Sequence, residues 1–455
     1  MGVTEQLAKF IVESSIAEMP PEGIRIAKDA ILDCFGVTLA GAATADGRII
    51  TSFVREVGGE PVATVIGGGF RTSAPWAALA NGTMGHAEDF DDSAPAMLGH
   101  PSVPLLPAIL ALGEGRRATG REVIESYIVG FETESKLGRA LIPSGHYQHG
   151  WHATGTLGTM GATAASAKML KLDVGQTRMA LGIAASEVSG LRQNFGTMTK
   201  PFHAGNAARG GVVAAMLARH GFTAHENIIE ERSGFCSVFK GDNPCELDSI
   251  TAGLGETLEL TTSGIAFKLY PSCHETHACI TTALELAREH AIQPQDVESV
   301  DCAVSELIGT VAFYTEPRTG LEGKFSVEYC IARALHDGKV GLEDFTDEKV
   351  NEAEVREMVK KIKRQVDPSL PGLSVIDLAI KTRDGREIKK RSDPILKGFP
   401  QLPLTRDELA AKYTGCAGLT LSPRDVERSL ALLESLEEVA GIAELMDVVR
   451  GKSIS

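Results

Sequence analysis

Apolar residues recur at helical spacing over the first 262 residues, and this pattern constrains the fold most. In PPEGIRIAKDAILDCFGVTLAG (residues 20–41), two prolines suit a first turn and glycine follows as a stop, while intervals of three or four separate Ile24, Ala27, Ile31 and Phe35. Similar helices are expected over residues 74–87, 119–141, 154–172 and 204–222. Several carry small residues on most faces, which indicates helices packed against helices.

The pattern changes after about residue 265. VESVDCAVSEL (297–307) alternates like a strand, and residues 373–393 form two alternating runs around Asp384-Gly385, a hairpin signal. Residues 405–449 return to amphipathic helices with Ser and Thr caps. We therefore predict a mainly α protein with an inserted α+β domain. Residues 1–264 and 396–455 form a discontinuous all-helical domain, and residues 265–395 form the smaller α+β domain.

The charge balance limits the classes of partner. The chain has 455 residues and a formal net charge of -15, which argues against nucleic-acid binding because phosphate contacts need a basic face. A small acidic substrate is still compatible, since a few buried cations outweigh distant charge.

The cysteines and the apolar runs indicate the compartment. Eight cysteines are scattered without a CxxC pair, as expected for reduced thiols in a chain of this length. The longest apolar run, VPLLPAILAL, is far shorter than the roughly 20 residues that span a bilayer. The N-terminus has no signal-peptide pattern. We expect a cytoplasmic protein that does not bind membranes.

The segment of residues 86–107, HAEDFDDSAPAMLGHPSVPLLP, concentrates charge beside apolar residues. We expect Asp89 and Ser93, one helical turn apart, to face a common cleft. The Gly99-His100-Pro101 turn should present the His100 imidazole at the start of the next helix. Charge at Asp89 and His100 would be costly among apolar neighbours unless it served the protein's chemistry.

Three further acids of this segment, Glu88, Asp91 and Asp92, fit a solvated turn. A metal site is the alternative, because histidine and carboxylate together suit divalent cations. In that interpretation the segment from His86 to Asp92 would bind a metal together with His100.

The stretch SGHYQHGWHATG (144–155) spaces three histidines by three residues. On a helix this spacing drifts by about 300°, so the three rings would not share one face. We expect His146 and His149 to be structural histidines whose ring nitrogens have hydrogen-bond partners. Tyr147 and His152 are candidate hydrogen-bonding groups of the site, just ahead of a helix start.

Two lysines lie in loops that precede helices. Lys200, in NFGTMTKPFHAGNAARGG, is suited to bind a carboxylate or to act as a base, with an exposed loop lysine as the alternative. Lys268, in FKLYPSCHETH, stands before a Pro turn that opens a helix. Tyr329, in GKFSVEYC, stands at another helix start, where core packing is the alternative.

Taken together, five motifs resemble the MmgE/PrpD family, which contains 2-methylcitrate dehydratases, cis-aconitate decarboxylases and iminodisuccinate epimerases. The motifs are DFDDS…GHPS, GWHATGTLG, GTMTKPFHAGNAA, KLYPSCH and KFSVEY, and they occur in the family's order over essentially the whole chain. The decarboxylase-like members carry a histidine where this chain has Cys273, a departure that argues against cis-aconitate decarboxylation.

The resemblance implies a large all-helical MmgE/PrpD-type domain, a smaller lid domain, an active site between them, a homodimer, and catalysis without metal or organic cofactor. It also implies eight site positions. Catalytic roles fall on Asp89, His100, Tyr147, His152 and Lys200, and substrate binding falls on Ser93, Lys268 and Tyr329.

These implications define a reaction class. The substrate would be a small di- or tricarboxylic acid, and the enzyme a 2-methylcitrate dehydratase-like or iminodisuccinate epimerase-like lyase or isomerase. A bond next to a carboxylate must break, so the site needs cations for the carboxylates and groups that move a proton. The alternatives are a cis-aconitate decarboxylase, a metal-dependent hydrolase and a catalytically silent binding protein.

The residue roles follow from that demand. We expect Lys200, Lys268 and His100 to neutralise substrate carboxylates, and Asp89 to orient His100. The proton would be moved by Tyr147, by His152 or by Lys200 itself.

Overall fold

The computed structural model describes residues 1–372 and 374–451 and is mainly α-helical. Leu373, the first residue of the expected hairpin segment, and residues 452–455, the end of the expected helical domain, lie outside the described residues. The chain divides into two compact units. Unit 1 comprises Met1–Gln193, Thr199–Phe267 and Leu404–Ser455, and unit 2 comprises Asn194–Met198 and Lys268–Pro403.

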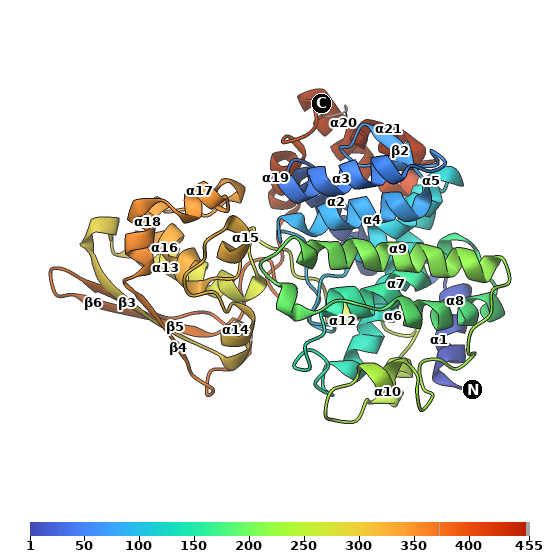
Figure 1. Ribbon diagram of the computed structural model, residues 1–455, viewed down its shortest axis with the longest axis horizontal. Coiled ribbons are helices and arrows are strands. Elements are labelled where there is room, and N and C mark those ends of the chain that lie inside the picture. Colours follow the sequence, from blue (N-terminus) through green and yellow to red (C-terminus); the bar gives the residue numbers. More distant parts are fainter. Residues whose placement is uncertain (373, 452–455) are drawn as a thin grey trace. The chain divides into compact units, whose positions relative to one another are not determined.

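Unit 1 is built from helices (Figure 1). The long helices before residue 220 are α1 (Val3–Glu13), α2 (Pro21–Ala42), α3 (Ala45–Val57), α4 (Ala74–Ala87), α5 (Ser102–Gly115), α6 (Gly120–Leu141), α7 (Ala153–Met169), α8 (Val174–Glu187) and α9 (Thr199–Arg219). The short helices α10 (Phe235–Phe239), α11 (Leu247–Thr251) and α12 (Glu259–Thr262) follow, and the chain returns with α19 (Arg406–Ala417), α20 (Pro423–Glu434) and α21 (Ala443–Val449). The predicted helices of the first 262 residues and of the chain's end are present.

Small residues bring the central helices of unit 1 close together. Helices α4, α7 and α9 pack against one another, and a Cβ added at Gly82 of α4 would lie 2.8 Å from the Cα of Gly205 in α9. Such an approach is possible only where both helices lack bulk at the crossing. The small residues on most faces of these helices therefore reflect the packing of helix against helix, as predicted.

Two features of unit 1 differ from the sequence-based expectation. A short antiparallel hairpin, β1 (Ala63–Val65) and β2 (Phe70–Thr72), interrupts the helical region. Strands of three residues are too short for an alternation to be recognised. In addition, α9 begins at Thr199, five residues earlier than expected, so Lys200 lies in a first helical turn and not in a loop. Pro201 is compatible with that turn because the first N–H groups of a helix have no intrahelical partner.

Unit 2 is an α+β unit whose sheet has the order β4-β3-β5-β6. The strands are β3 (Val297–Val304), β4 (Ile362–Val366), β5 (Ile376–Thr382) and β6 (Glu387–Arg391); β3 runs parallel to β4 and antiparallel to β5. The β5–β6 hairpin turns at Asp384-Gly385, where Gly385 has a φ of 89°, which confirms the predicted turn.

Helices supply the rest of the unit 2 core. They are α13 (His277–Glu289), α14 (Glu306–Val311), α15 (Gly320–Gly323), α16 (Val327–Asp337), α17 (Asp347–Val350) and α18 (Ala353–Val359). Helices α13 and α16 pack on each other, and α13 contacts β5 while α16 contacts β4. A single apolar cluster joins them to the sheet through residues such as Ile280, Ile331 and Ile380.

Two sequence-based expectations concern features spread over the whole chain. All eight cysteines are free thiols in the structure. Among the helices of the described residues, none combines the length and the apolar character that a bilayer crossing requires.

Candidate active site

Four helix ends of unit 1 bring the candidate residues together. His86 lies in the last turn of α4, His100 precedes α5, His152 is the N-cap of α7 and Lys200 is the second residue of α9. Helices α4, α5, α7 and α9 pack mutually, so these ends meet at one place. Three of them are N-termini, whose free N–H groups and dipoles favour an anion.

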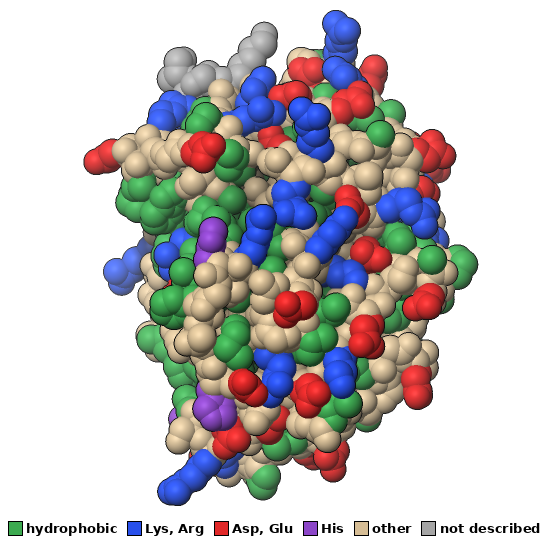
Figure 2. All heavy atoms as spheres, turned by 90° about the vertical axis from the view of Figure 1, so that its right-hand side faces the viewer, with side chains coloured by type: hydrophobic (Ala, Val, Ile, Leu, Met, Phe, Trp, Pro, Cys, Tyr) green, Lys and Arg blue, Asp and Glu red, His purple; other side chains and the backbone are tan. Residues whose placement is uncertain are grey.

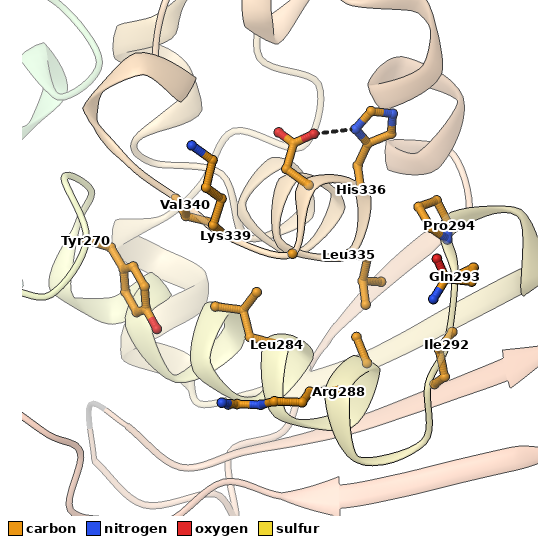
Figure 3. A pocket seen from close by; sticks show the side chains of 13 residues that line it. Tyr270, Leu284, Arg288, Ile292, Gln293, Pro294, Leu335, His336, Lys339 and Val340 are labelled. Atoms are coloured by element: carbon orange, nitrogen blue, oxygen red, sulfur yellow. Dashed lines mark hydrogen bonds and ion pairs between the residues drawn. The ribbon is translucent and has the colours of Figure 1, made fainter.

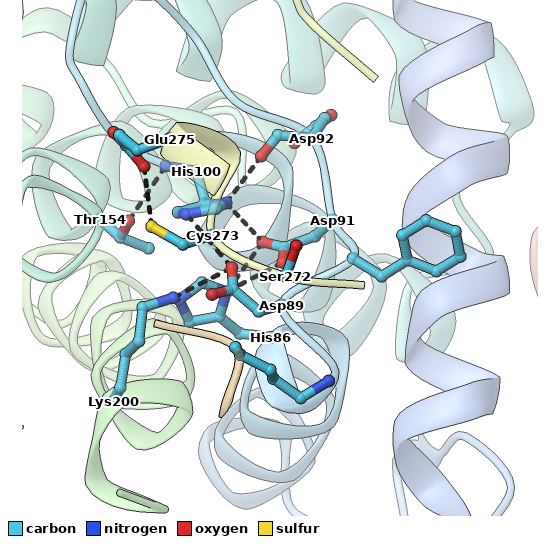
Figure 4. A network of polar contacts seen from close by, with 12 residues as sticks. His86, Asp89, Asp91, Asp92, His100, Thr154, Lys200, Ser272, Cys273 and Glu275 are labelled. Atoms are coloured by element: carbon cyan, nitrogen blue, oxygen red, sulfur yellow. Dashed lines mark hydrogen bonds and ion pairs between the residues drawn. The ribbon is translucent and has the colours of Figure 1, made fainter. Parts of the chain in front are cut away.

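The side chain of Lys200 reaches into this group with its amino end (Figure 4). Its Nζ atom is 2.9 Å from Nε2 of His86 and 3.2 Å from Oδ1 of Asp89, and the side chain is buried. Burial lowers the pKa of His86 to about 3; the attraction of Asp91 opposes this shift and the charge of Lys200 adds to it. His86 is therefore neutral, and its Nε2 accepts a hydrogen bond from the ammonium group.

Asp91 lies between two imidazole rings (Figure 4). Its carboxylate oxygens are 2.9 Å and 3.0 Å from Nδ1 of His86, and Oδ2 is 3.1 Å from Nδ1 of His100. Burial alone would raise the pKa of Asp91, but the interactions with His100 and His86, including their hydrogen bonds, hold it well below its ordinary value. The expectation that Asp91 belongs to a solvated turn is wrong, because the segment folds inward between the helices.

Asp92 is also buried, which corrects the same expectation. Its carboxyl group accepts a hydrogen bond from the Ser102 hydroxyl at 2.5 Å, and Ser102 in turn lies 2.6 Å from the Tyr127 hydroxyl. Burial and the neighbouring Asp33 raise the pKa of Asp92 well above its usual range. Of the three acids, only Glu88 is partly exposed, and it is the C-cap of α4.

Asp89 and Ser93 do not lie one helical turn apart, because α4 ends at Ala87. Asp89 adopts a φ of 50°, in the left-handed region, where aspartate is tolerated better than most side chains. Its Oδ1 is 3.8 Å from Nε2 of His100, farther than the contact between Asp91 and that ring. Ser93 instead forms a two-way backbone bridge with Ala266, at 2.9 Å and 2.8 Å.

His152 and His203 extend the cluster. Their Nδ1 atoms are 3.0 Å apart, and the ring of His152 lies 5.7 Å from that of His86. Burial, with the charge of Lys200 as the next cause, lowers the pKa of His152 well below its ordinary value and that of His203 to about 4. The site thus combines the ammonium group of Lys200 with the neutral imidazoles of His86, His152 and His203.

Tyr147 is held by Arg192. The guanidinium carbon lies 4.0 Å from the centre of the phenol ring, and Nη1 donates to the Tyr147 carbonyl at 2.8 Å. His146 is a structural histidine, as expected, with contacts of 2.5 Å to the Phe239 carbonyl and 2.8 Å to the Thr156 hydroxyl. The same expectation is wrong for His149, which is exposed and makes no side-chain hydrogen bond within the described ranges.

The remaining candidates belong to unit 2. Lys268 is fully buried. Tyr329 lies in the core of the unit, where its hydroxyl donates to the Asp344 carbonyl, a placement that favours packing. Cys273, at the position that departs from the decarboxylase-like motif, has its thiol 2.7 Å from Oε2 of Glu275.

The geometry bears on the alternative of a metal site. His86, Asp89, Asp91 and His100 each offer a ligand atom, all within 4.8 Å of one another. However, the ammonium group of Lys200 already lies against two of these donors, on His86 and Asp89. A divalent cation among them would face the repulsion of this ammonium group at short range. The donor set therefore fits a lysine-centred site better than a metal site.

A separate pocket lies in unit 2 (Figure 3) and has a volume of about 590 Å³. Several of its polar side chains bind one another or nearby residues: His336 contacts Asp337 at 2.7 Å and Lys339 contacts Glu343 at 2.7 Å. None of the eight predicted site residues lines it.

The face drawn in Figure 2 mixes Lys and Arg with Asp and Glu, and apolar side chains gather toward its left edge. No continuous basic surface is visible on that face, in keeping with the net charge of -15.

Three members of the cluster were missed or underrated by sequence reasoning. His86 entered only as a possible metal ligand and Asp91 as part of a solvated turn or a metal site, and His203 was given no definite role. The available signal was their position: His86 precedes the DFDD motif by three residues, and His203 follows Lys200 by three, on the same face of a helix.

The fold and the cluster define a mainly helical protein with a buried lysine, histidine and aspartate site. The MmgE/PrpD N-terminal domain model matches residues 5–248 and the MmgE/PrpD C-terminal domain model matches residues 270–438. The chain belongs to the MmgE/PrpD family.

Curated relatives align with nearly the whole chain. Cis-aconitate decarboxylase of Mus musculus is 29% identical over 100% of this chain and 94% of the relative. The Homo sapiens enzyme of the same name is 28% identical over 99% and 95%. The cis-aconitate decarboxylase-like protein oryM of Aspergillus oryzae is 26% identical over 99% and 98%.

Proposed function

We propose that this chain is a cofactor-independent and metal-independent lyase or isomerase. It moves a proton at the carbon next to a carboxylate of a small di- or tricarboxylic acid, in a 2-methylcitrate dehydratase-like or iminodisuccinate epimerase-like reaction. One observation carries the proposal: the ammonium group of Lys200 lies in a buried cluster of neutral imidazoles where three helix N-termini meet.

The chemistry of the reaction explains why this arrangement is suitable. Removing a proton next to a carboxylate leaves enolate charge on an anion that is already negative, and such a state is poorly stabilised in water. A buried cation and helix N-termini offset this charge in a medium of low dielectric constant. Neutral imidazoles are present to accept or return the proton.

Within the cluster, we assign carboxylate binding to Lys200. His100 and His152 are the candidates for proton transfer. The charge of Lys200 acts on His152, and His100 and Lys200 both face Oδ1 of Asp89. Tyr147, Lys268, Ser93 and Tyr329 stay as predicted contributors.

Cis-aconitate decarboxylation is the second candidate, and the curated relatives with that name favour it. Cys273 is the observation against it, because the decarboxylase-like motif has an imidazole at that position and here a thiol contacts Glu275.

A single panel of substrates tests the proposal. The protein is incubated in deuterium oxide with 2-methylcitrate, citrate, cis-aconitate and iminodisuccinate. Solvent exchange, dehydration, carbon dioxide release and stereochemistry are followed together. We expect exchange or turnover with one of these acids; carbon dioxide release from cis-aconitate would select the second candidate. An inert protein with all four would contradict both.

We also propose that the enzyme is a homodimer that buries the exposed apolar side chains of α3 and α9. Helices α3 and α9 each pack against α4 in unit 1 (Figure 1). Their exposed apolar residues are Ile49, Phe53, Val57, Phe202 and Met216. Exposed apolar side chains on two helices that pack against the same neighbour favour contact with a second copy of the chain over water. Free thiols fit the cytoplasm, where we place the enzyme.

A further inference from the structure

Among the described residues, Asp91 is the only one whose side chain contacts Nδ1 of both His86 and His100. It is fully buried and contacts Nδ1 of each ring, whereas Lys200 contacts Nε2 of His86 and Asp89 faces Nε2 of His100. Its contacts determine which nitrogen of each ring carries the hydrogen.

His100 is constrained first. Its Nδ1 lies 2.8 Å from the backbone carbonyl of Asp92 and 3.1 Å from Oδ2 of Asp91. Both neighbours are acceptors, so Nδ1 must be the donor. When the ring is neutral, the lone pair is therefore on Nε2, which faces Asp89.

His86 is constrained from both sides. Both oxygens of Asp91 face its Nδ1, which must donate, and Nζ of Lys200 lies 2.9 Å from its Nε2. A neutral imidazole has one donor and one acceptor nitrogen. Nε2 is then the acceptor, and it holds the ammonium group of Lys200 at a fixed place beside Asp89.

We propose that Asp91 is a positioning residue that fixes both imidazoles in the tautomer with hydrogen on Nδ1. It thereby directs one lone pair, on His86, to Lys200 and the other, on His100, to the reacting groups. The catalytic consequence rests on the proposed function, whereas the tautomers themselves do not.

The substitution Asp91→Asn keeps the size of the side chain and replaces one of its two hydrogen-bond acceptors by a donor. The amide offers one oxygen and one NH₂ group in place of two acceptors, so it no longer matches two Nδ1 donors. If the NH₂ group faces His86, hydrogen moves to Nε2 of that ring and points at the ammonium group. Lys200 then loses its acceptor and moves toward Asp89.

The tautomers are measured directly by NMR of the full-length protein labelled with ¹⁵N-histidine, with the His86→Gln and His100→Asn variants used to assign the signals. We expect both rings of the wild type to carry hydrogen on Nδ1 and a bare Nε2. In Asp91→Asn, at least one ring should change tautomer. A wild-type ring protonated on Nε2 alone would overturn the inference, whether or not the variant folds.

Kinetics provide the second measurement, once a substrate is found. We expect Asp91→Asn to lower kcat roughly 10²- to 10⁴-fold, with a change in KM of less than about 10-fold, because orientation fails more than binding. The acidic limb of the kcat profile should also move to lower pH, since an imidazolium would lose its counterion. Asp91→Glu, which keeps both acceptors, should recover part of kcat.

Glu134→Gln is the matched control. Glu134 is a fully buried carboxyl of α6 in the same unit, and neither of its oxygens has a hydrogen-bond partner within the described part of the chain. Burial raises its pKa well above the ordinary value, so the amide resembles its neutral form. We expect wild-type tautomers and wild-type kcat. An equal loss of kcat in Glu134→Gln and Asp91→Asn would overturn the positioning role.

The two proposals fail separately. Correct tautomers in a protein that turns over none of the four acids would contradict the proposed function and leave the tautomer assignment standing. Turnover in a protein with hydrogen on Nε2 of either ring would support the proposed function and contradict the tautomer assignment.

Discussion

Nζ of Lys200 lies 2.9 Å from Nε2 of His86, a residue 114 positions away in the chain. This contact places a cation against a neutral ring in the interior of a helical unit, with Asp89 as a counterion at 3.2 Å. The carboxylate of a substrate would approach the same ammonium group, so the charge that binds the substrate is in place before it arrives.

Lys200→Ala should lower kcat/KM at least roughly 10³-fold while leaving the fold intact, because the substrate carboxylate and the enolate lose their buried cation. Turnover assays and circular dichroism check this outcome. The control is Lys171→Ala, which removes an exposed lysine paired with Glu122. Equal activity in both variants would contradict the role of Lys200.

His100→Asn should lower kcat roughly 10²- to 10⁴-fold, since the amide replaces the Nδ1 donor but supplies no base at Nε2. The same change at His146 should leave kcat within about 3-fold and lower the free energy of unfolding by about 2 kcal/mol, because the Thr156 contact is lost in a buried place. Steady-state kinetics and urea unfolding separate the two. Reversed effects would assign the chemistry to His146.

The helices of unit 1 were predictable because a stripe of apolar residues repeats over many turns. The β5–β6 turn was predictable from a local pattern as well, since Asp-Gly between two alternating runs indicates a hairpin turn. The hairpin β1–β2 carried no such repeat in its three-residue strands.

The cluster was predictable only in part. Lys200 and His100 stand out because a polar or charged side chain among apolar neighbours is costly to bury unless it has partners or takes part in the protein's chemistry. Asp91 and Glu88 belong to the same short acidic run, yet one is buried between two rings and the other caps α4. Their difference depends on how residues 88–101 fold against α5 and α7, which is a long-range property. The same holds for the metal alternative, which depends on a lysine 114 residues from His86.

Removing divalent metals should leave activity unchanged. The ammonium group of Lys200 lies where a metal ion would need to contact His86 and Asp89, so we expect no stoichiometric metal in purified protein. Elemental analysis and assays after treatment with a chelator measure this. Activity lost to the chelator and restored by one divalent ion would support the hydrolase alternative.

Acid should destabilise the wild type through His203. Its pKa of about 4 lies below the ordinary value of 6.5, so the unfolded chain binds more protons between these values. Stability is therefore present above pH 6.5 and is lost as pH falls toward 4, by at most about 3 kcal/mol. His203→Gln should lack this loss. Unfolding curves of both proteins at several pH values test it, and parallel pH dependences would contradict the burial of a neutral ring.

Phe53→Glu should convert the proposed dimer into a monomer. Phe53 is 45% exposed on α3 and packs edge-on against Trp76 at 6.0 Å, so a second copy would cover the ring and the charge would be buried on association. Light scattering coupled to size-exclusion chromatography measures the mass. The control Val366→Glu changes a comparably exposed apolar residue on β4 of unit 2, and the mass of this variant should equal that of the wild type. A monomeric wild type would contradict the proposed dimer. Dissociation only in Val366→Glu would place the interface at β4 and not at α3.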